Sequence, residues 1–187
     1  MNTIIDLIGS MFIETTIILI ITNLNIQMMI ATQEQIKSNG SQYLALGMTS
    51  TMEFDLYKVG YRVSGTEKIT TADSTSFKFY ADIDNNSSVD SVYYYLSSRP
   101  FNTSTGEYAL YRKVNTENPM IISYTKEFKF TYFDSLGTKL TYTSLAAPAK
   151  RNEIATINVT SITRSEAGLG SDYQSTEWTK KFRPKNL

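Results

Sequence analysis

The chain has 187 residues, contains neither cysteine nor histidine, and balances 18 Lys and Arg residues against 18 Asp and Glu residues. Without thiols or imidazoles, it lacks disulfides, cysteine nucleophiles, Ser-His-Asp triads and ordinary zinc sites. Because it has no basic excess, we expect no nucleic-acid partner.

The first element is an apolar run from Met11 to Ala31, about as long as a helix must be to cross a bilayer. The preceding "MNTIIDLIG" carries no Lys or Arg, unlike a secretory signal peptide. We therefore interpret residues 10–31 as a transmembrane helix, with a buried helix of a soluble domain as the alternative. One carboxylate, Glu14, interrupts the run, and an acid at membrane depth costs roughly 2.5–3.5 kcal/mol. Something must compensate for that cost.

Gly9 is followed by Ser10, then by Met-Phe-Ile, then by Glu14 and a long apolar run. This order resembles the class III signal of type IV pilins and pseudopilins, although Ile8 and Ser10 replace the basic residue and the Phe that are usual there. The resemblance implies that residues 1–9 are a leader, that prepilin peptidase cuts between Gly9 and Ser10, and that the new amino terminus is methylated.

The resemblance also gives Glu14 a role in assembly. The Ser10 amine of one subunit would pair with Glu14 of its neighbour, so that two charges costly in lipid become acceptable when helices pack together. The alternative is an anchor helix whose acid reaches the headgroups. The implied partners are other pilins or pseudopilins, the peptidase, and membrane lipid before assembly. The implied location is the inner (cytoplasmic) membrane, spanned once with the head outside the cytoplasm, and later a pilus or pseudopilus.

After the apolar run, helical spacing continues towards Gly60, because no proline occurs before Pro100. Gly60 is a signal for the end of the helix, and we expect a break or kink at Gly40. Beyond Gly65, alternating aromatic and β-branched residues predict an antiparallel meander. Its expected strands are 74–83, 89–96, 107–114, 126–133, 138–145 and 153–164, with 126–133 and 138–145 forming the clearest hairpin.

These patterns predict an α+β protein in which the C-terminal half of a long transmembrane helix packs on an antiparallel sheet. Residues 32–187 would then form an extracytoplasmic, pilin-like head.

The sharpest local pattern in the head is "DIDNNSSVD", in which oxygen-bearing residues fall at alternate positions. Calcium-binding loops of the EF-hand type use this spacing, although Ser87 replaces their turn glycine and Tyr93 their bidentate Glu. Calcium is therefore one interpretation, and a hairpin connection capped by its own polar side chains is the other. The candidate ligands are Asp82, Asp84, Asn86, Ser88 and Asp90.

Other residues carry weaker signals. The run Tyr93-Tyr94-Tyr95 fits carbohydrate or partner recognition, but aromatic pairing across a sheet explains it better. Glu53 and Asp55 do not face each other on a helix, so they are poor candidates for a pair of catalytic acids. We therefore expect a structural subunit and no enzyme. The alternatives are a membrane-anchored ligand-binding or adhesive domain that does not assemble, and an anchored enzyme of undetected class.

Overall fold

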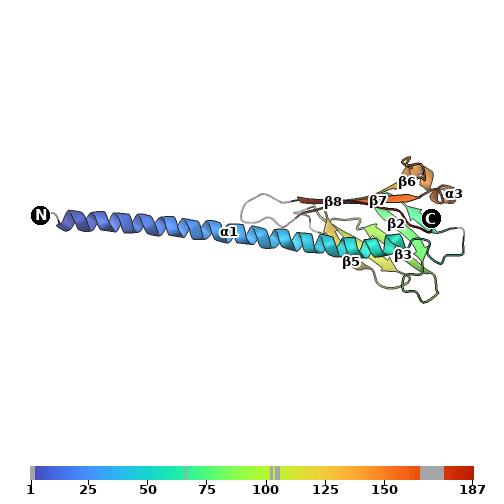
Figure 1. Cartoon of the computed structure of the whole chain (residues 1–187), viewed down its shortest axis with the longest axis horizontal. Helices are drawn as coiled ribbons and strands as arrows, with labels where there is room; N and C mark the ends of the chain where they lie inside the picture. Colours follow the sequence, from blue (N-terminus) through green and yellow to red (C-terminus); the bar gives the residue numbers. More distant parts are fainter. Residues whose placement is uncertain (1–2, 66, 102, 104–105, 165–174) are drawn as a thin grey trace.

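The computed structural model describes residues 3–65, 67–101, 103, 106–164 and 175–187. It consists of one long helix, α1 (Thr3–Tyr57), that projects from a β-rich head (Figure 1). At about 1.5 Å per residue, such a helix is roughly 80 Å long. The predicted α+β class, with an apolar N-terminal helix and antiparallel sheets, is confirmed.

The α1 helix runs through Gly40 without interruption, so the predicted break there is wrong. An interior glycine costs about 1 kcal/mol relative to alanine, which is small beside the cooperative hydrogen bonding of long helical segments on both sides. The predicted signal at Gly60 is real, because this residue has a φ of 76° just beyond the end of α1. Its amide donates a hydrogen bond to the carbonyl of Tyr80, at 2.9 Å, which directs the chain onto the first sheet.

Two antiparallel sheets form the head. In the first, the strands lie in chain order: β1 (Ile69–Ala72), β2 (Ser76–Ala81), β3 (Asp90–Leu96), β4 (Tyr108–Val114) and β5 (Met120–Thr125). In the second, β6 (Glu127–Phe133) and β8 (Ser175–Phe182) flank β7 (Thr156–Arg164). Two one-turn helices, α2 (Tyr142–Leu145) and α3 (Pro148–Arg151), lie between β6 and β7. The expected meander is therefore split into two sheets.

The predicted hairpin of residues 126–133 with 138–145 forms only next to its turn, where Phe133 bridges Lys139 and the Leu140 amide donates to the Tyr132 carbonyl at 2.9 Å. From Tyr142 the chain forms α2, and the strand that pairs with β6 along its length is β7. The turn itself forms: the Asp134 carboxylate accepts the amides of Leu136 and Thr138, at 2.9 and 2.7 Å. Beyond it, Thr141 caps α2 through its side chain, and Pro148 occupies the start of α3. These helix-start signals override the strand propensity of the segment.

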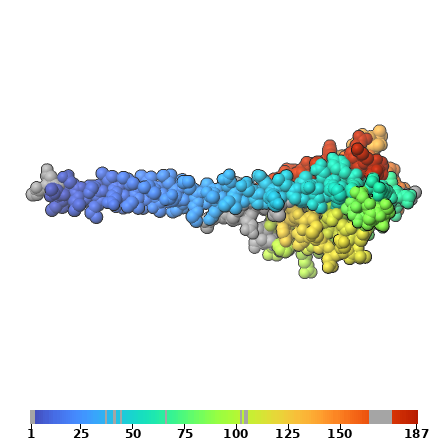
Figure 2. Space-filling model, turned by 60° about the horizontal axis from the view of Figure 1, so that its bottom comes forward, coloured from blue at the N-terminus to red at the C-terminus, as the bar shows by residue number. Residues whose placement is uncertain are grey.

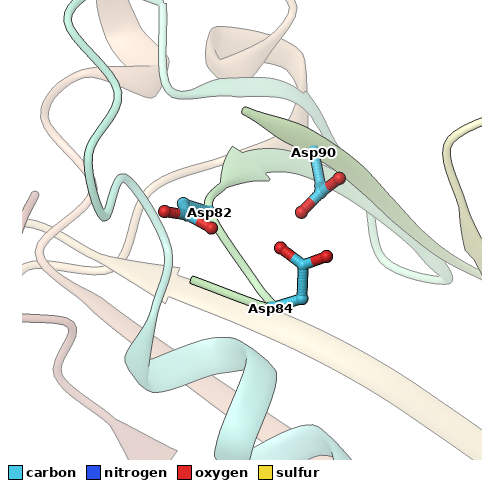
Figure 3. A group of neighbouring side chains, drawn as sticks. All are labelled: Asp82, Asp84 and Asp90. Atoms are coloured by element: carbon cyan, nitrogen blue, oxygen red, sulfur yellow. The ribbon is translucent and has the colours of Figure 1, made fainter. Parts of the chain in front are cut away.

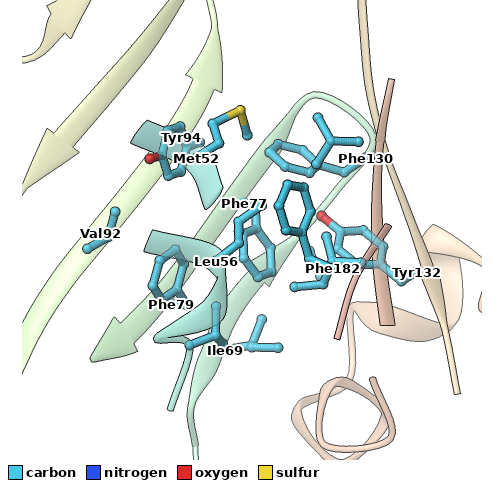
Figure 4. Packing of buried hydrophobic residues seen from close by; sticks show 14 of the residues in the cluster. Met52, Leu56, Ile69, Phe77, Phe79, Val92, Tyr94, Phe130, Tyr132 and Phe182 are labelled. Carbon is cyan, nitrogen blue, oxygen red and sulfur yellow. The ribbon is translucent and has the colours of Figure 1, made fainter. Parts of the chain in front are cut away.

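The core lies where the last third of α1 meets both sheets (Figure 4). Met48, Met52 and Leu56 on the helix are fully buried, and their spacing places them on one side of it. The Phe77 ring of β2 lies 5.5 Å from the Phe130 ring of β6, so the two sheets share a single core. The other buried aromatic residues in the described part of the chain are Phe79, Tyr94, Phe128, Tyr132 and Phe182.

Candidate functional site

The N-terminal part of α1, drawn in blue, projects from the head (Figure 2). The predicted signal residues Gly9, Ser10 and Glu14 belong to this part of the helix. Every side chain from residue 3 to residue 29 is exposed, and the apolar ones cover the helix on all sides. The helix is long and apolar enough to cross a membrane. Residues 3–9 of the predicted leader continue this helix, while residues 1 and 2 lie outside the described residues.

The hydroxyl groups in the apolar run are satisfied within the helix itself. Thr15, Thr16 and Thr22 each donate to the carbonyl four residues earlier, at 2.8 Å. In contrast, Glu14 has no hydrogen-bond or ion-pair partner in the described part of the chain. It shares a surface with Ser10, one turn away, among the side chains of Ile13, Ile17 and Ile18. An ionised carboxylate without a partner is costly in an apolar environment.

A second candidate site is the loop between β2 and β3, which brings together the three aspartates of the predicted calcium motif. One carboxylate oxygen from each of Asp82, Asp84 and Asp90 lies within 4.8 Å of the other two (Figure 3). Asp82 follows the last residue of β2, and Asp90 is the first residue of β3. The side chains of Asp82 and Asp90 are buried and that of Asp84 is exposed.

Asp82 joins the loop to the segment that follows α1. Its Oδ2 accepts hydrogen bonds from Arg62 Nη1, at 2.9 Å, and from the Ser87 amide, at 3.1 Å. Burial opposes ionisation of Asp82, but these hydrogen bonds outweigh it and lower the pKa of its carboxyl group. The Asp82 amide also donates to the carbonyl of Tyr61, at 3.0 Å. The loop is therefore attached to the end of the long helix.

Asp90 is held in place from both sides, because its Oδ2 accepts the Ile83 amide, at 3.1 Å, and its Oδ1 accepts Asn115 Nδ2, at 2.7 Å. Asp84 bonds only within its own turn in the described structure: its two oxygens accept the amide and the side-chain nitrogen of Asn86. Two of the three carboxylates are thus fixed by the fold, and the third lies on the exposed loop.

The two other predicted ligands shape the turn. Asn86 Oδ1 accepts the amide of Ser88, at 2.7 Å. Ser87, at the position of the EF-hand glycine, has a φ of 71°, the left-handed conformation that this glycine supplies. Tyr93, at the position of the bidentate Glu, lies in β3 and stacks on Tyr95, with 4.8 Å between ring centroids. The loop therefore shares its spacing with an EF-hand but connects two strands.

Sequence reasoning missed a buried charged cluster between α1 and the first sheet. Asp55 is fully buried and accepts hydrogen bonds from Arg112 Nε at 2.6 Å, Arg112 Nη2 at 3.0 Å and the Tyr94 hydroxyl at 2.5 Å. Burial and the nearby Asp55 carboxylate raise the pKa of Tyr94. Glu53 lies on another face and pairs with Lys180 of β8, at 2.7 Å. The expectation that Glu53 and Asp55 do not face each other agrees with these separate partners.

The tyrosine run divides between the two faces of β3. Tyr94 points into the core, whereas Tyr93 and Tyr95 stack in a row that continues to Tyr111 of β4, at 5.2 Å from Tyr95. Cross-strand aromatic pairing therefore accounts for the run.

Comparison with protein families, with curated proteins and with solved structures gives no match for this chain.

Proposed function

We propose that this chain is a structural subunit, a minor pilin or pseudopilin, of a type IV pilus or a type II secretion-like filament. The observation that supports the proposal most is the apolar first half of α1, which is exposed on all sides. A helix of this composition requires lipid or other apolar helices around it, since large exposed apolar surfaces are unfavourable in water. A membrane provides the first environment and a bundle of identical helices provides the second.

In this proposal the leader is residues 1–9, and prepilin peptidase cuts between Gly9 and Ser10. In the described structure a side chain at Gly9 would point into open space, so the bond between Gly9 and Ser10 lies on an open helix surface. The amine of Ser10 is then methylated. Before assembly the subunit spans the inner membrane with its head outside the cytoplasm.

Glu14 holds neighbouring subunits in register in this proposal. Ser10 and Glu14 lie on one face of α1, separated by about 6 Å along the helix axis. A neighbour shifted along that axis by one turn brings its carboxylate beside the Ser10 amine. The two charges then neutralise each other in the apolar bundle, which offsets the cost of burying either one.

The test is a Glu14→Leu substitution in the native host, with Glu34→Leu as the matched control. Glu34 lies on the same helix and is exposed, but beyond the apolar run. Removing one partner of a buried ion pair costs about 3–5 kcal/mol, equivalent to a few hundredfold or more in association. We expect Glu14→Leu to be made, inserted and cut, yet to be missing from sheared filaments and from cross-links to partner pilins. Glu34→Leu should assemble normally.

Incorporation of Glu14→Leu at the wild-type level would contradict this role for Glu14. If both variants also remain in the membrane and no filament contains the wild-type chain, the protein is a single-span anchor for a ligand-binding or adhesive head.

A further inference from the structure

We propose that the loop between β2 and β3 binds one calcium ion through the carboxylates of Asp82, Asp84 and Asp90. Calcium binds protein oxygens at about 2.3–2.6 Å, so two oxygens on one ion are at most about 5 Å apart. One oxygen from each aspartate lies within 4.8 Å of the other two, which meets this limit. Figure 3 shows the carboxylates of Asp84 and Asp90 turned towards each other, with that of Asp82 beside them.

An unsatisfied oxygen is the second, independent observation. Oδ1 of Asp82 is buried and has no hydrogen-bond partner among the described residues, while Oδ2 accepts from Arg62 and Ser87. The side chain of Asp82 is 0% exposed, so it has no direct contact with bulk solvent. A buried carboxylate oxygen without a partner is costly, and a cation shared with two adjacent carboxylates would satisfy it.

The charge of the loop also favours a cation. Three carboxylates are opposed by two basic side chains, Arg62 on Asp82 and Lys58, whose Nζ donates to the Ile83 carbonyl at 2.5 Å. Both basic groups approach from the α1 side, and no basic side chain contacts Asp84 or Asp90 among the described residues. Repulsion between those two carboxylates remains for a metal ion to relieve.

The chemistry of the ligands selects calcium over other common ions. All the ligands are oxygens, and the chain contains no cysteine or histidine to attract zinc or copper. Magnesium requires near-ideal octahedral geometry at shorter distances, whereas calcium accepts the irregular arrangement of two fixed carboxylates and one exposed loop carboxylate. An ion here would attach the loop more firmly to the junction between the helix and the head, because Asp82 already bonds Tyr61 and Arg62.

The experiment uses the full chain in detergent micelles, stripped with a chelator, and follows thermal unfolding by the fluorescence of its single tryptophan, Trp178. Calcium loops of extracellular modules bind with dissociation constants of about 10⁻⁴–10⁻³ M. We therefore expect calcium at about 10 mM to raise the melting temperature by about 3–11 °C and magnesium to raise it much less. Isothermal titration should give one calcium ion per chain.

Asp84→Asn is the decisive variant, because the amide keeps the size of the side chain and removes its charge on an exposed loop. It should still fold cooperatively, and its melting temperature without metal sets its own baseline, because the change removes the repulsion with Asp90 but alters the hydrogen bonds to Asn86. Relative to that baseline, calcium should produce no shift. Asp134→Asn is the matched control: Asp134 also accepts backbone amides in a turn, and its variant should respond to calcium like the wild type. No shift and no heat of binding for the wild type, an equal shift with magnesium, or a retained shift in Asp84→Asn would overturn the proposal.

Discussion

Arg112 neutralises a carboxylate that lies fully buried between the long helix and the first sheet, and replacing it with leucine tests how α1 is attached to the head. Its guanidinium holds both oxygens of Asp55, at 2.6 and 3.0 Å, and its side chain is 17% exposed. In the Arg112→Leu variant, the Tyr94 hydroxyl is the hydrogen-bond partner that remains to Asp55 in the described structure.

The geometry sets the size of the effect. Removing one partner of a buried, hydrogen-bonded ion pair typically costs about 3–5 kcal/mol, because the other charge stays buried without compensation. For a domain of this size each kcal/mol lowers the melting temperature by about 2–4 °C, so we expect a decrease of about 6–20 °C. The matched control is Lys180→Leu, which breaks the ion pair with Glu53. Those side chains are 34% and 39% exposed, so the loss should stay below about 1 kcal/mol.

Thermal unfolding of the full chain in detergent, followed by Trp178 fluorescence, measures both variants. A double variant, Asp55→Leu with Arg112→Leu, should be more stable than Arg112→Leu alone, because it removes the uncompensated charge. Two results would contradict this account of how the ion pair attaches the helix. One is an Arg112→Leu variant that melts within a few degrees of Lys180→Leu. The other is a double variant that is less stable than Arg112→Leu alone.

Four further predictions concern the head and the helix that packs on it. Gly60→Ala should cost at least about 1–2 kcal/mol in urea unfolding, because Gly60 has a φ of 76° and a Cβ there would lie 2.9 Å from a backbone oxygen. Gly47→Ala, in open space on α1, should instead stabilise the protein by about 0.5–1 kcal/mol. A fragment beginning at Gln33 should be soluble and melt cooperatively, because Ala45 is the first buried residue of α1 among the described side chains; aggregation of this fragment would contradict an independent head. Burial raises the pKa of Tyr94 and Tyr132, so the free energy of unfolding should decrease above about pH 10, where the unfolded chain loses phenolic protons that the folded chain keeps; urea titrations above and below that pH measure it.

Local sequence patterns were sufficient to predict a strand where buried and partly exposed side chains alternate along it. Phe77, Phe79 and Ala81 are buried in β2 while their neighbours are partly exposed, and the sequence shows this alternation directly. The pattern does not identify β8, which lies in the polar tail and carries charged side chains along an edge of its sheet. Its position depends on pairing with β7, which no local property of the segment indicates. The short strand β1 and the strand β5 were missed as well.

The candidate sites show the same contrast. Asp82, Asp84 and Asp90 occur within nine residues of sequence, so their spacing alone indicated that they could meet. Asp55 meets Tyr94 and Arg112 across 39 and 57 positions, and the register of three separate elements decides that contact. Helical geometry did predict that Asp55 and Glu53 point in different directions. The sheet to which Asp55 points could be learned only from the fold.

The mass of the mature N-terminus tests the proposed filament subunit most directly. The chain is purified from its native host and its N-terminal peptide is identified by mass spectrometry, with Gly9→Val as the variant that should block processing. The proposal predicts a wild-type chain that begins at methylated Ser10 and a Gly9→Val chain that keeps residues 1–9. A wild-type chain that still begins at Met1, or a Gly9→Val chain cut like the wild type, would contradict it.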